Sequence, residues 1–362
     1  MSSHGGTGSI RTLTREDIPG VVALYKAVFG AAERSGAGDL ESYFDKVFFQ
    51  SPWYDEDLCS LVYLGSHGRI LGFLGLQPRR MSMSGRSLRV AVATKFMVAP
   101  YCDDRLAAVR LLRTLFAGPQ DLLMTGLSSD AMRRIWERLG GTTALAYSLS
   151  WTRLLRPTWH VMSWVGRRLG LKPLALVGRP FCAAADAVAA RMAPNRFDQG
   201  EPGYTAEDSE AATVVTHLPD FYPRRALRPD YEERSLRWLL EVAGQTSRSK
   251  SLRRRLVRNS QREVVGWFLY FLEPGGESEV LQMAARQDSV GSVLQVLLAD
   301  AWREGSVTLS GRLEPHFLPQ LSSRHCYFSQ NGLWMLIHSK KRDVLNTILS
   351  GDAFISRLEG EW

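Results

Sequence analysis

Cysteines are few in this sequence, and they are scattered. Four occur in 362 residues, at positions 59, 102, 182 and 326, with no CxxC pair and no clustered histidines. This spacing argues against a zinc site and against the disulfide framework of a small secreted domain, and it suits a reducing compartment. We therefore expect a protein without a bound metal.

Long apolar runs are missing as well. No stretch approaches the roughly 18 uninterrupted apolar residues of a transmembrane helix. The opening residues, MSSHGGTGSI, are polar and glycine-rich and lack the apolar region of a signal peptide. We expect a disordered tail over residues 1–9 and a cytoplasmic protein.

Several enzyme signatures are also absent. The sequence contains no Gly-x-Ser-x-Gly elbow, no HExxH and no P-loop, so nothing supports a hydrolase, a metalloprotease or a kinase. Its composition, 45% hydrophobic and 23% charged, is that of an ordinary soluble protein, and its length favours two domains. The net charge of +8 favours anionic partners such as a phosphorylated cofactor, acidic lipid headgroups or nucleic acid.

The first half alternates strand and helix patterns. In order, these are a strand at 10–13, a capped helix ending at Gly30, two strands within 60–77, a strand at 87–98, a helix at 105–116, a strand at 121–127 and a helix at 128–141. This order predicts an α/β protein with a mixed sheet flanked by helices.

The second half repeats this layout. SLRRRLVRNSQREVVGWFLYF (251–271) has the strand, polar turn and strand of residues 60–77, and Gly266 takes the place of Gly72. The repeat predicts two tandem domains, residues 10–150 and 201–362, joined by a connector at 151–200.

Three pieces of the first half resemble the GCN5-related N-acetyltransferase (GNAT) family. They are RILGFLG, FMVAPYCDDRLAAVRLLRTLF and DLLMTGLSSDAMRRIWERLGG, and the resemblance covers Ile10 to Tyr147. In the family, backbone N–H groups of the turn after a Val-x-Pro sequence hold the pyrophosphate of acetyl-CoA or a longer acyl-CoA. The resemblance implies an acyl-carrier-binding domain at 10–150 and a second, degenerate GNAT-like domain at 201–362 that shapes the acceptor site.

The resemblance also implies which residues hold the carrier. They are Met97, Val98, Asp103, Asp104, Arg105, Leu106, Ala107, Ala108 and Ser129. The turn departs from the family, because Asp103 replaces an Arg or Gln and Leu106 replaces a Gly. Each nearby carboxylate repels a pyrophosphate by about 1 kcal/mol at ~4 Å in water, although Asp also caps helices well. An altered acyl-CoA site, a site for another acyl carrier and a lost site all stay open.

The resemblance does not identify the catalytic residues. Trp136 stands where the family often has a tyrosine that protonates the leaving thiolate, and an indole N–H cannot do this. A thiolate needs little such help, so transfer is still feasible. Ser129 either bonds the carrier or caps its helix, and capping is favoured. Weak candidates for the base are Lys95, Tyr101 and His325, the last reaching the cleft from the second domain.

The second half lacks a carrier turn. AARQDSVGSVLQ (284–295) has no proline and only Gly291 where the first half has its turn. RPDYEERSLRWLL (228–240) resembles the segment that opens the second half of tandem GNAT proteins, among them Fem-type peptidyl transferases and bacterial polysaccharide acyltransferases. By that resemblance, this half shapes the acceptor pocket.

Two basic stretches bear on partners. The connector places Trp159, Met162, Val165 and Leu169 on one helical side near Arg167, Arg168 and Lys172, which fits either a membrane surface or a helix packed between domains. Residues 247–262 carry seven basic side chains but no aromatic ones, which favours a solvated strand over a nucleic-acid site.

Together these observations predict an acyl-CoA-dependent N-acyltransferase. The favoured acceptor is a long-chain lipid amine such as a sphingoid base, as in the GNAT-like bacterial ceramide synthases, which would place the cytoplasmic protein at the periphery of the inner membrane. One alternative is transfer to an amino sugar in polysaccharide biosynthesis. The other is a non-catalytic scaffold that kept the fold.

Overall fold

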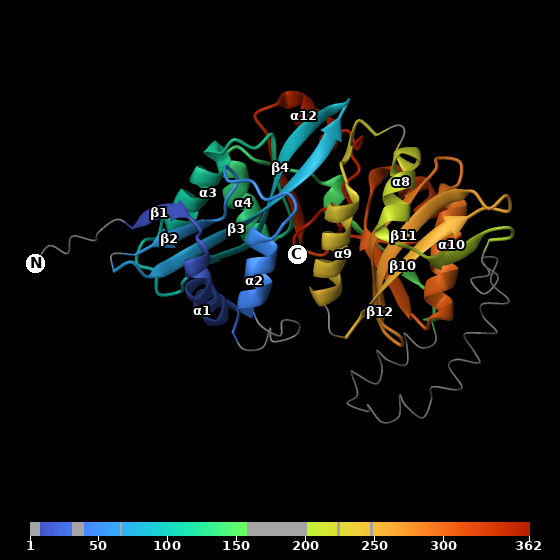
Figure 1. Cartoon of the computed structure of the whole chain (residues 1–362), viewed down its shortest axis with the longest axis horizontal. Coiled ribbons are helices and arrows are strands. Elements are labelled where there is room, and N and C mark those ends of the chain that lie inside the picture. The colour runs from blue at the N-terminus through green and yellow to red at the C-terminus, as the bar shows by residue number, and fades with distance from the viewer. Residues whose placement is uncertain (1–7, 31–39, 66, 158–200, 223–224, 247–248) are drawn as a thin grey trace, which may run out of the picture.

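The computed structural model describes residues 8–30, 40–65, 67–157, 201–222, 225–246 and 249–362. The predicted tail falls almost wholly outside these residues, and so do all but the first seven residues of the predicted connector. Two sheets flanked by helices lie side by side (Figure 1), which confirms the mixed α/β class. None of the described helices is both long and apolar enough to cross a membrane.

The first sheet runs in the order β1-β2-β3-β4-β5-β15-β6. Its strands are β1 (Ser9–Thr12), β2 (Leu61–Leu64), β3 (Ile70–Met83), β4 (Arg86–Val98), β5 (Leu122–Ser128), β15 (Trp334–His338) and β6 (Thr142–Thr143), with β9 (Leu227–Pro229) beside β3. Its helices are η1 (Arg15–Asp17), α1 (Ile18–Phe29), α2 (Leu40–Phe49), α3 (Ala107–Ala117), α4 (Asp130–Arg138), η3 (Ala146–Ser148) and α12 (Arg342–Leu349). Side chains of α1 and α2 pack with Phe73, and those of α3 pack with Leu74, so the helices cover both faces.

The second sheet runs in the order β14-β7-β13-β12-β11-β10-β8. Its strands are β14 (Tyr327–Ser329), β7 (Ser150–Leu154), β13 (Thr308–Arg312), β12 (Glu277–Ala285), β11 (Val264–Leu272), β10 (Ser251–Arg258) and β8 (Thr205–Asp208). Its helices are α8 (Ala211–Phe221), α9 (Glu233–Thr246), α10 (Val290–Arg303), η5 (Pro315–Phe317) and α11 (Leu318–Ser323).

Both sheets have the same topology. Each has one parallel pair, β4–β5 in the first and β12–β13 in the second, and the other main-path neighbours are antiparallel. The halves exchange one strand: β7 follows β6 in sequence yet joins the second sheet, and β15 follows β14 yet joins the first. The predicted boundary at residue 150 therefore falls at the start of the exchanged strand β7. Alternating side chains in a sequence indicate that a strand is buried, but they do not indicate which sheet the strand joins.

Buried side chains hold each exchanged strand in place. In β7, Trp151 is 5% exposed and its indole lies over Gly311, where a Cβ atom would be 3.1 Å from the ring. In β15, Leu336 and Ile337 are fully buried, and the indole of Trp136 donates a hydrogen bond to the Ile337 carbonyl oxygen at 3.0 Å. A side chain at position 311 would therefore have to push the Trp151 indole aside by a few tenths of an ångström.

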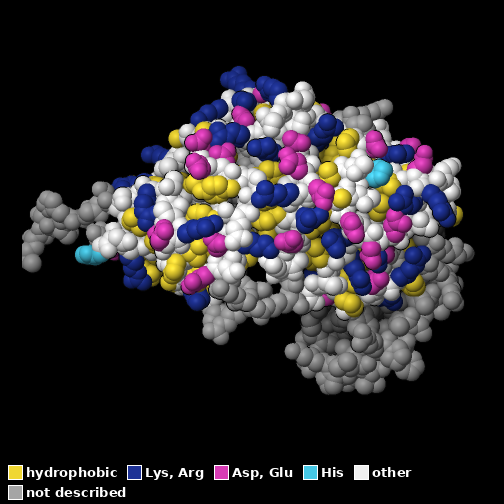
Figure 2. Space-filling model, in the orientation of Figure 1, with side chains coloured by type: hydrophobic (Ala, Val, Ile, Leu, Met, Phe, Trp, Pro, Cys, Tyr) yellow, Lys and Arg dark blue, Asp and Glu magenta, His cyan; other side chains and the backbone are white. Residues whose placement is uncertain are grey.

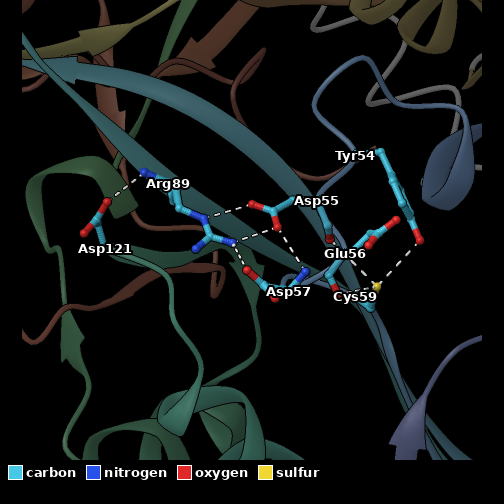
Figure 3. Close-up of polar contacts among 7 residues, drawn as sticks. All are labelled: Tyr54, Asp55, Glu56, Asp57, Cys59, Arg89 and Asp121. Atoms are coloured by element: carbon cyan, nitrogen blue, oxygen red, sulfur yellow. Dashed lines mark hydrogen bonds and ion pairs between the residues drawn. The ribbon is translucent and has the colours of Figure 1, made fainter.

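A polar cluster joins the start of β4 to the residues that precede β2 and β5 (Figure 3). The guanidinium of Arg89 on β4 donates to Asp55 at 2.9 and 2.7 Å and to Asp57 at 3.1 Å, while its backbone N–H donates to Asp121 at 2.9 Å. Burial by itself raises the pKa of Asp121, but hydrogen bonds from Lys341 and Arg89 outweigh it and hold that pKa below its usual range. Because Lys341 precedes α12, the cluster also fastens the exchanged segment.

Charges are well mixed on the surface. On the face shown in Figure 2, Lys and Arg side chains alternate with Asp and Glu over both halves. The net charge of +8 is therefore not gathered into one basic patch on that face.

A carboxyl group is buried beneath the second sheet. Glu314 is 4% exposed and its Oε2 atom has no hydrogen bond among the described residues. Burial, and then the charge of Glu359, raises its pKa well above the usual range, against Arg225 and Arg312. His316 lies 3.8 Å from Oε2, but burial lowers the pKa of His316 to about 3, so it is neutral and forms no ion pair.

We expect Glu314→Gln to stabilise the protein in a pH-dependent way. The pKa of Glu314 is higher in the folded state than in the unfolded state, where it is about 4.3. The free energy of unfolding of the wild type therefore falls as the pH rises from the unfolded-state pKa toward the folded-state pKa. The amide has no such dependence, so the gain in the free energy of unfolding should be absent near pH 4 and reach about 1–3 kcal/mol at neutral and alkaline pH. Urea unfolding at pH 4, 7 and 9 measures this, and a gain independent of pH would contradict it.

Candidate functional site

The two parallel strands of the first sheet separate beyond three residue pairs. β4 and β5 pair from Val90 with Leu122 to Val92 with Met124 and no further. Past that point a cleft of about 480 Å³ opens between them. It lies at the carboxyl ends of both strands, the usual ligand position in open α/β sheets, because backbone groups there lack a neighbouring strand.

A β-bulge shapes the wall of the cleft on β4. Phe73 pairs with Met97 and Gly75 with Thr94, so Lys95 and Phe96 together face the single residue between the two β3 positions. Lys95 has φ = 50°, the left-handed region that costs a side-chain-bearing residue free energy. Bulges re-aim the residues that follow and often lie next to active sites.

Both halves of the chain line the cleft, and most lining side chains are apolar. From the first half come Tyr25, Phe29, Leu74, Ala93, Thr94, Lys95, Phe96, Leu112, Thr125, Leu127, Ser128, Ser129, Met132 and Trp136. From the second half come Thr246, Arg357, Glu361 and Trp362. The aromatic side chain of Phe29 is 39% exposed and that of Trp362 is 2% exposed, so the cleft leads from solvent to a buried wall.

The last seven residues run between the two sheets, where the C label lies in Figure 1. The backbone N–H of Leu358 donates to the Leu281 carbonyl oxygen of β12 at 3.0 Å. Three residues later, Glu361 bonds to β5 of the other sheet. The segment therefore joins the open ends of both sheets.

Glu361 is held at the separated end of β5. Its Oε1 atom accepts hydrogen bonds from the Thr125 hydroxyl at 2.5 Å, from the Gly126 N–H and from the Leu127 N–H at 3.2 Å. The side chain is 9% exposed and lines the cleft. A neighbouring strand would satisfy these N–H groups in a continuous sheet, and here a carboxylate does so.

The turn before α3 has its own carboxylate. Asp104 accepts the Leu106 N–H at 2.9 Å and the Tyr63 hydroxyl at 2.5 Å, and Arg110 lies 3.3 Å away. The hydrogen bond from Tyr63 is the largest cause that lowers the pKa of Asp104. An N–H group of the predicted phosphate turn is therefore already taken by a side chain.

Residues 9–121 match the family model of the acetyltransferase (GNAT) domain. The N-terminal half of this chain carries a GNAT domain. With it the chain is an acyltransferase, of the class that uses acyl-CoA as cosubstrate, which confirms that part of the sequence prediction. No curated protein sequence matches the chain.

Solved structures extend the likeness in fold to both halves. A conserved protein of unknown function and probable N-acyltransferase from Enterococcus faecalis is 11% identical, with a TM-score of 0.60 over 95% of this chain and 74% of that one. GCN5-related N-acetyltransferases from Anabaena variabilis and Kribbella flavida are each 12% identical, with TM-scores of 0.58 and 0.56 over 92% of this chain and 73% and 72% of theirs. At such identities the likeness is one of fold.

The GNAT domain places the predicted carrier residues in two environments. Asp103, Arg105 and Leu106 are exposed in the turn, and Ala108 is half-buried at the first turn of α3. Met97 and Ala107 are 2% and 0% exposed and belong to the core. Val98, half-buried at the end of β4, leads into this turn. The turn is thus open to a ligand, while Met97 and Ala107 present only backbone.

The predicted catalytic residues do not come together. Lys95 lines the cleft of the GNAT domain, whereas the hydroxyl of Tyr101, 48% exposed, accepts a hydrogen bond from Arg69 at 3.0 Å and is not among the described lining residues. His325 is exposed in the turn before β14, the edge strand of the second sheet, and does not line the cleft either. Strands β7 and β13 lie between β14 and β12 in the second sheet, and the structure does not bring His325 to the cleft.

Ser129 and Trp136 have structural contacts in the GNAT domain. Ser129 is the N-cap of α4 and accepts the Met132 N–H at 3.3 Å. Trp136, 1% exposed, packs against Phe116 with ring centroids 4.8 Å apart and bonds β15. Sequence reasoning missed Glu361, because a single glutamate between Gly360 and Trp362 belongs to no motif or spacing that could indicate a site.

The corresponding gap in the second sheet is filled. β12 and β13 also separate, beyond Val280 and Gly311, but the space there is only about 20 Å³. Trp151, Phe317 and Leu321 close it. No group of metal-ligating side chains gathers among the described residues of either half.

Proposed function

We propose that this protein transfers an acyl group from acyl-CoA to a primary amine in the cleft between β4 and β5. The observation that supports this is the cleft itself, an open end of the GNAT sheet lined by both halves. In this proposal the first half binds the carrier, the second contributes the acceptor side through Arg357 and Glu361, and Trp362 forms a wall that the acyl chain and the acceptor share. The reaction then occurs where the two strands diverge.

The acceptor we favour is an amine with a long hydrocarbon chain, such as a sphingoid base. The apolar lining supports this, since Tyr25, Phe29 and Leu127 are three of the many apolar groups along the cleft. Each buried CH₂ group contributes about 0.8 kcal/mol, so even a short chain would bind well there. Contact with an anionic membrane would depend on the basic connector, whose residues from 158 onward lie outside the described part of the chain.

An amino sugar is the second candidate, and a second cleft favours it. This cleft of about 170 Å³ lies beyond Leu127 and Arg357, which line both spaces. Its other lining residues include Ser150, Ser310 and Asn331, which offer hydroxyl and amide groups to a polyol. A sugar bound there would present its amine toward Leu127.

The test is CoA release by the purified protein with acetyl- and lauroyl-CoA and two amines, dodecylamine and glucosamine. Release with dodecylamine alone supports the lipid amine, and release with glucosamine alone supports the amino sugar. A scaffold would release no CoA and would show no rise in melting temperature with millimolar acyl-CoA of either length, since a ligand of the folded state stabilises it by RT ln(1 + [L]/Kd).

We also propose that the CoA pyrophosphate binds at the exposed turn before α3. Ala108→Phe should then weaken acyl-CoA binding at least tenfold, because a benzyl group fills the space at the first helical turn. Asp104→Ala is the matched variant: it frees the Leu106 N–H and removes a charge worth about 1 kcal/mol, and should tighten binding about fivefold. Calorimetry with acetyl-CoA measures both, and unchanged affinities would place the pyrophosphate elsewhere.

A further inference from the structure

We infer that Glu361 receives the ammonium group of the acceptor in the cleft and takes its proton, which makes it the base of the transfer. This inference rests on the proposed function and names the residue that function lacked. Among the described residues that line the cleft, Glu361 carries the one side-chain carboxylate. The acceptor it selects is an amine that is protonated in solution.

The two oxygens of Glu361 differ in their contacts. Oε1 accepts all three hydrogen bonds, from Thr125, Gly126 and Leu127. Within the described chain Oε2 has neither a hydrogen bond nor an ion pair, and it is not sealed in the core. Oε1 thus fixes the carboxylate in one orientation, and Oε2 keeps a lone pair for a donor in the cleft.

Two of the three donors on Oε1 are backbone N–H groups of β5. Gly126 and Leu127 lie in β5, and the Gly126 carbonyl oxygen accepts a hydrogen bond from Arg312 of the second half at 2.9 Å. Glu361 is also anchored through its own carbonyl oxygen, which accepts from Arg357 at 2.9 Å. A carboxylate that is held on both sides needs no rearrangement when the amine arrives.

The other polar groups of the cleft suit this role less well. The hydroxyls of Ser128 and Thr125 share a hydrogen bond at 3.1 Å, and the Ser129 hydroxyl caps α4. Lys95 and Arg357 are cations and repel an ammonium group. A carboxylate both attracts the ammonium and accepts its proton.

The acceptor enters as R–NH₃⁺, and Glu361 Oε2 takes one proton, which leaves a lone pair on nitrogen. That pair forms a C–N bond to the thioester carbonyl carbon, and the C–S bond of the tetrahedral intermediate then breaks to release CoA thiolate. The remaining extra proton on nitrogen neutralises the thiolate, and Glu361 returns its own to solvent. Ammonium and thioester thus give amide, CoA thiol and one proton.

The experiment compares two acceptors of equal length, dodecylamine and O-dodecylhydroxylamine, with acetyl-CoA at neutral pH. The first is an ammonium ion in solution and the second is unprotonated. We expect Glu361→Gln to lower kcat/KM for dodecylamine by about 100-fold, the scale of general-base catalysis, and that for O-dodecylhydroxylamine by less than fivefold. Glu304→Gln, at the end of α10 and paired with Arg253, is the matched control and should change neither.

The outcomes separate the inference from the proposed function. Equal losses for both acceptors in Glu361→Gln, or no loss for either, overturn the role of Glu361 while leaving acyl transfer intact. No CoA release by the wild-type protein with either acceptor overturns the proposed function and the inference with it. The glutamine keeps one oxygen for the three β5 donors, and a melting temperature within a few degrees of wild type confirms that the variant is folded.

Discussion

A chain ended at Gly332 is expected to contain no folded first domain, although all of the matched GNAT sequence is still present. The removed residues supply six buried side chains beneath the first sheet: Met335, Ile337, Val344, Ile348, Ala353 and Ile355. At about 1.5–3 kcal/mol for a large side chain, their loss approaches or exceeds the 5–15 kcal/mol by which a domain is usually stable. The unpaired edge of β5 would also promote aggregation. Circular dichroism and gel filtration measure the outcome.

Single substitutions in the same strand provide the graded control. Ile337→Ala should lower the free energy of unfolding by about 2–5 kcal/mol and leave a folded protein, since only one buried side chain is cut back. A truncated chain that stays monomeric and melts cooperatively would show that the exchanged strand is dispensable. The prediction therefore tests whether the two halves are one folding unit.

Trp362→Ala should destabilise the protein and change which acyl chains it accepts. The indole is 2% exposed, donates to the Leu358 carbonyl oxygen at 2.9 Å and lies beneath the Arg357 guanidinium at 4.8 Å. Its removal should lower the free energy of unfolding by about 3–5 kcal/mol. The space gained lies at the cleft wall, so kcat/KM should shift from acetyl-CoA toward octanoyl- or lauroyl-CoA.

Trp302→Ala is the matched control for that shift. Trp302 lies on α10 and packs against Arg156 with the guanidinium 4.9 Å from its ring, away from the residues that line the cleft. It should lower stability without changing the preference among acyl-CoAs. If Trp362→Ala weakens stability but leaves the chain-length preference as it was, the indole does not bound the acyl or acceptor site.

Local features were the ones that the sequence predicted best. The strand before Pro100, the helix after Asp104 and the N-cap at Ser129 depend on neighbouring residues, so their patterns are readable. These features follow from backbone geometry over a few residues.

The site could not be assembled in the same way. Glu361 meets Thr125, Gly126 and Leu127 across more than 230 positions of sequence, and no periodicity links them. His325 shows the converse, because a histidine near a predicted strand gave no information on which edge of the sheet that strand would occupy. Contacts between distant segments depend on strand order, which a local pattern does not contain.

By itself, the sequence determined the class of protein: a duplicated mixed α/β chain, a GNAT domain in the first half, and a second half without a carrier turn. Only the tertiary structure decided that the halves exchange β7 and β15 and that the gap between β12 and β13 is closed. It also decided that the carboxylate of Glu361 lines the gap between β4 and β5. The reason is physical. Alternation and capping record how each residue is buried or bonded locally, whereas the partner of a strand edge is chosen by the packing of the whole chain.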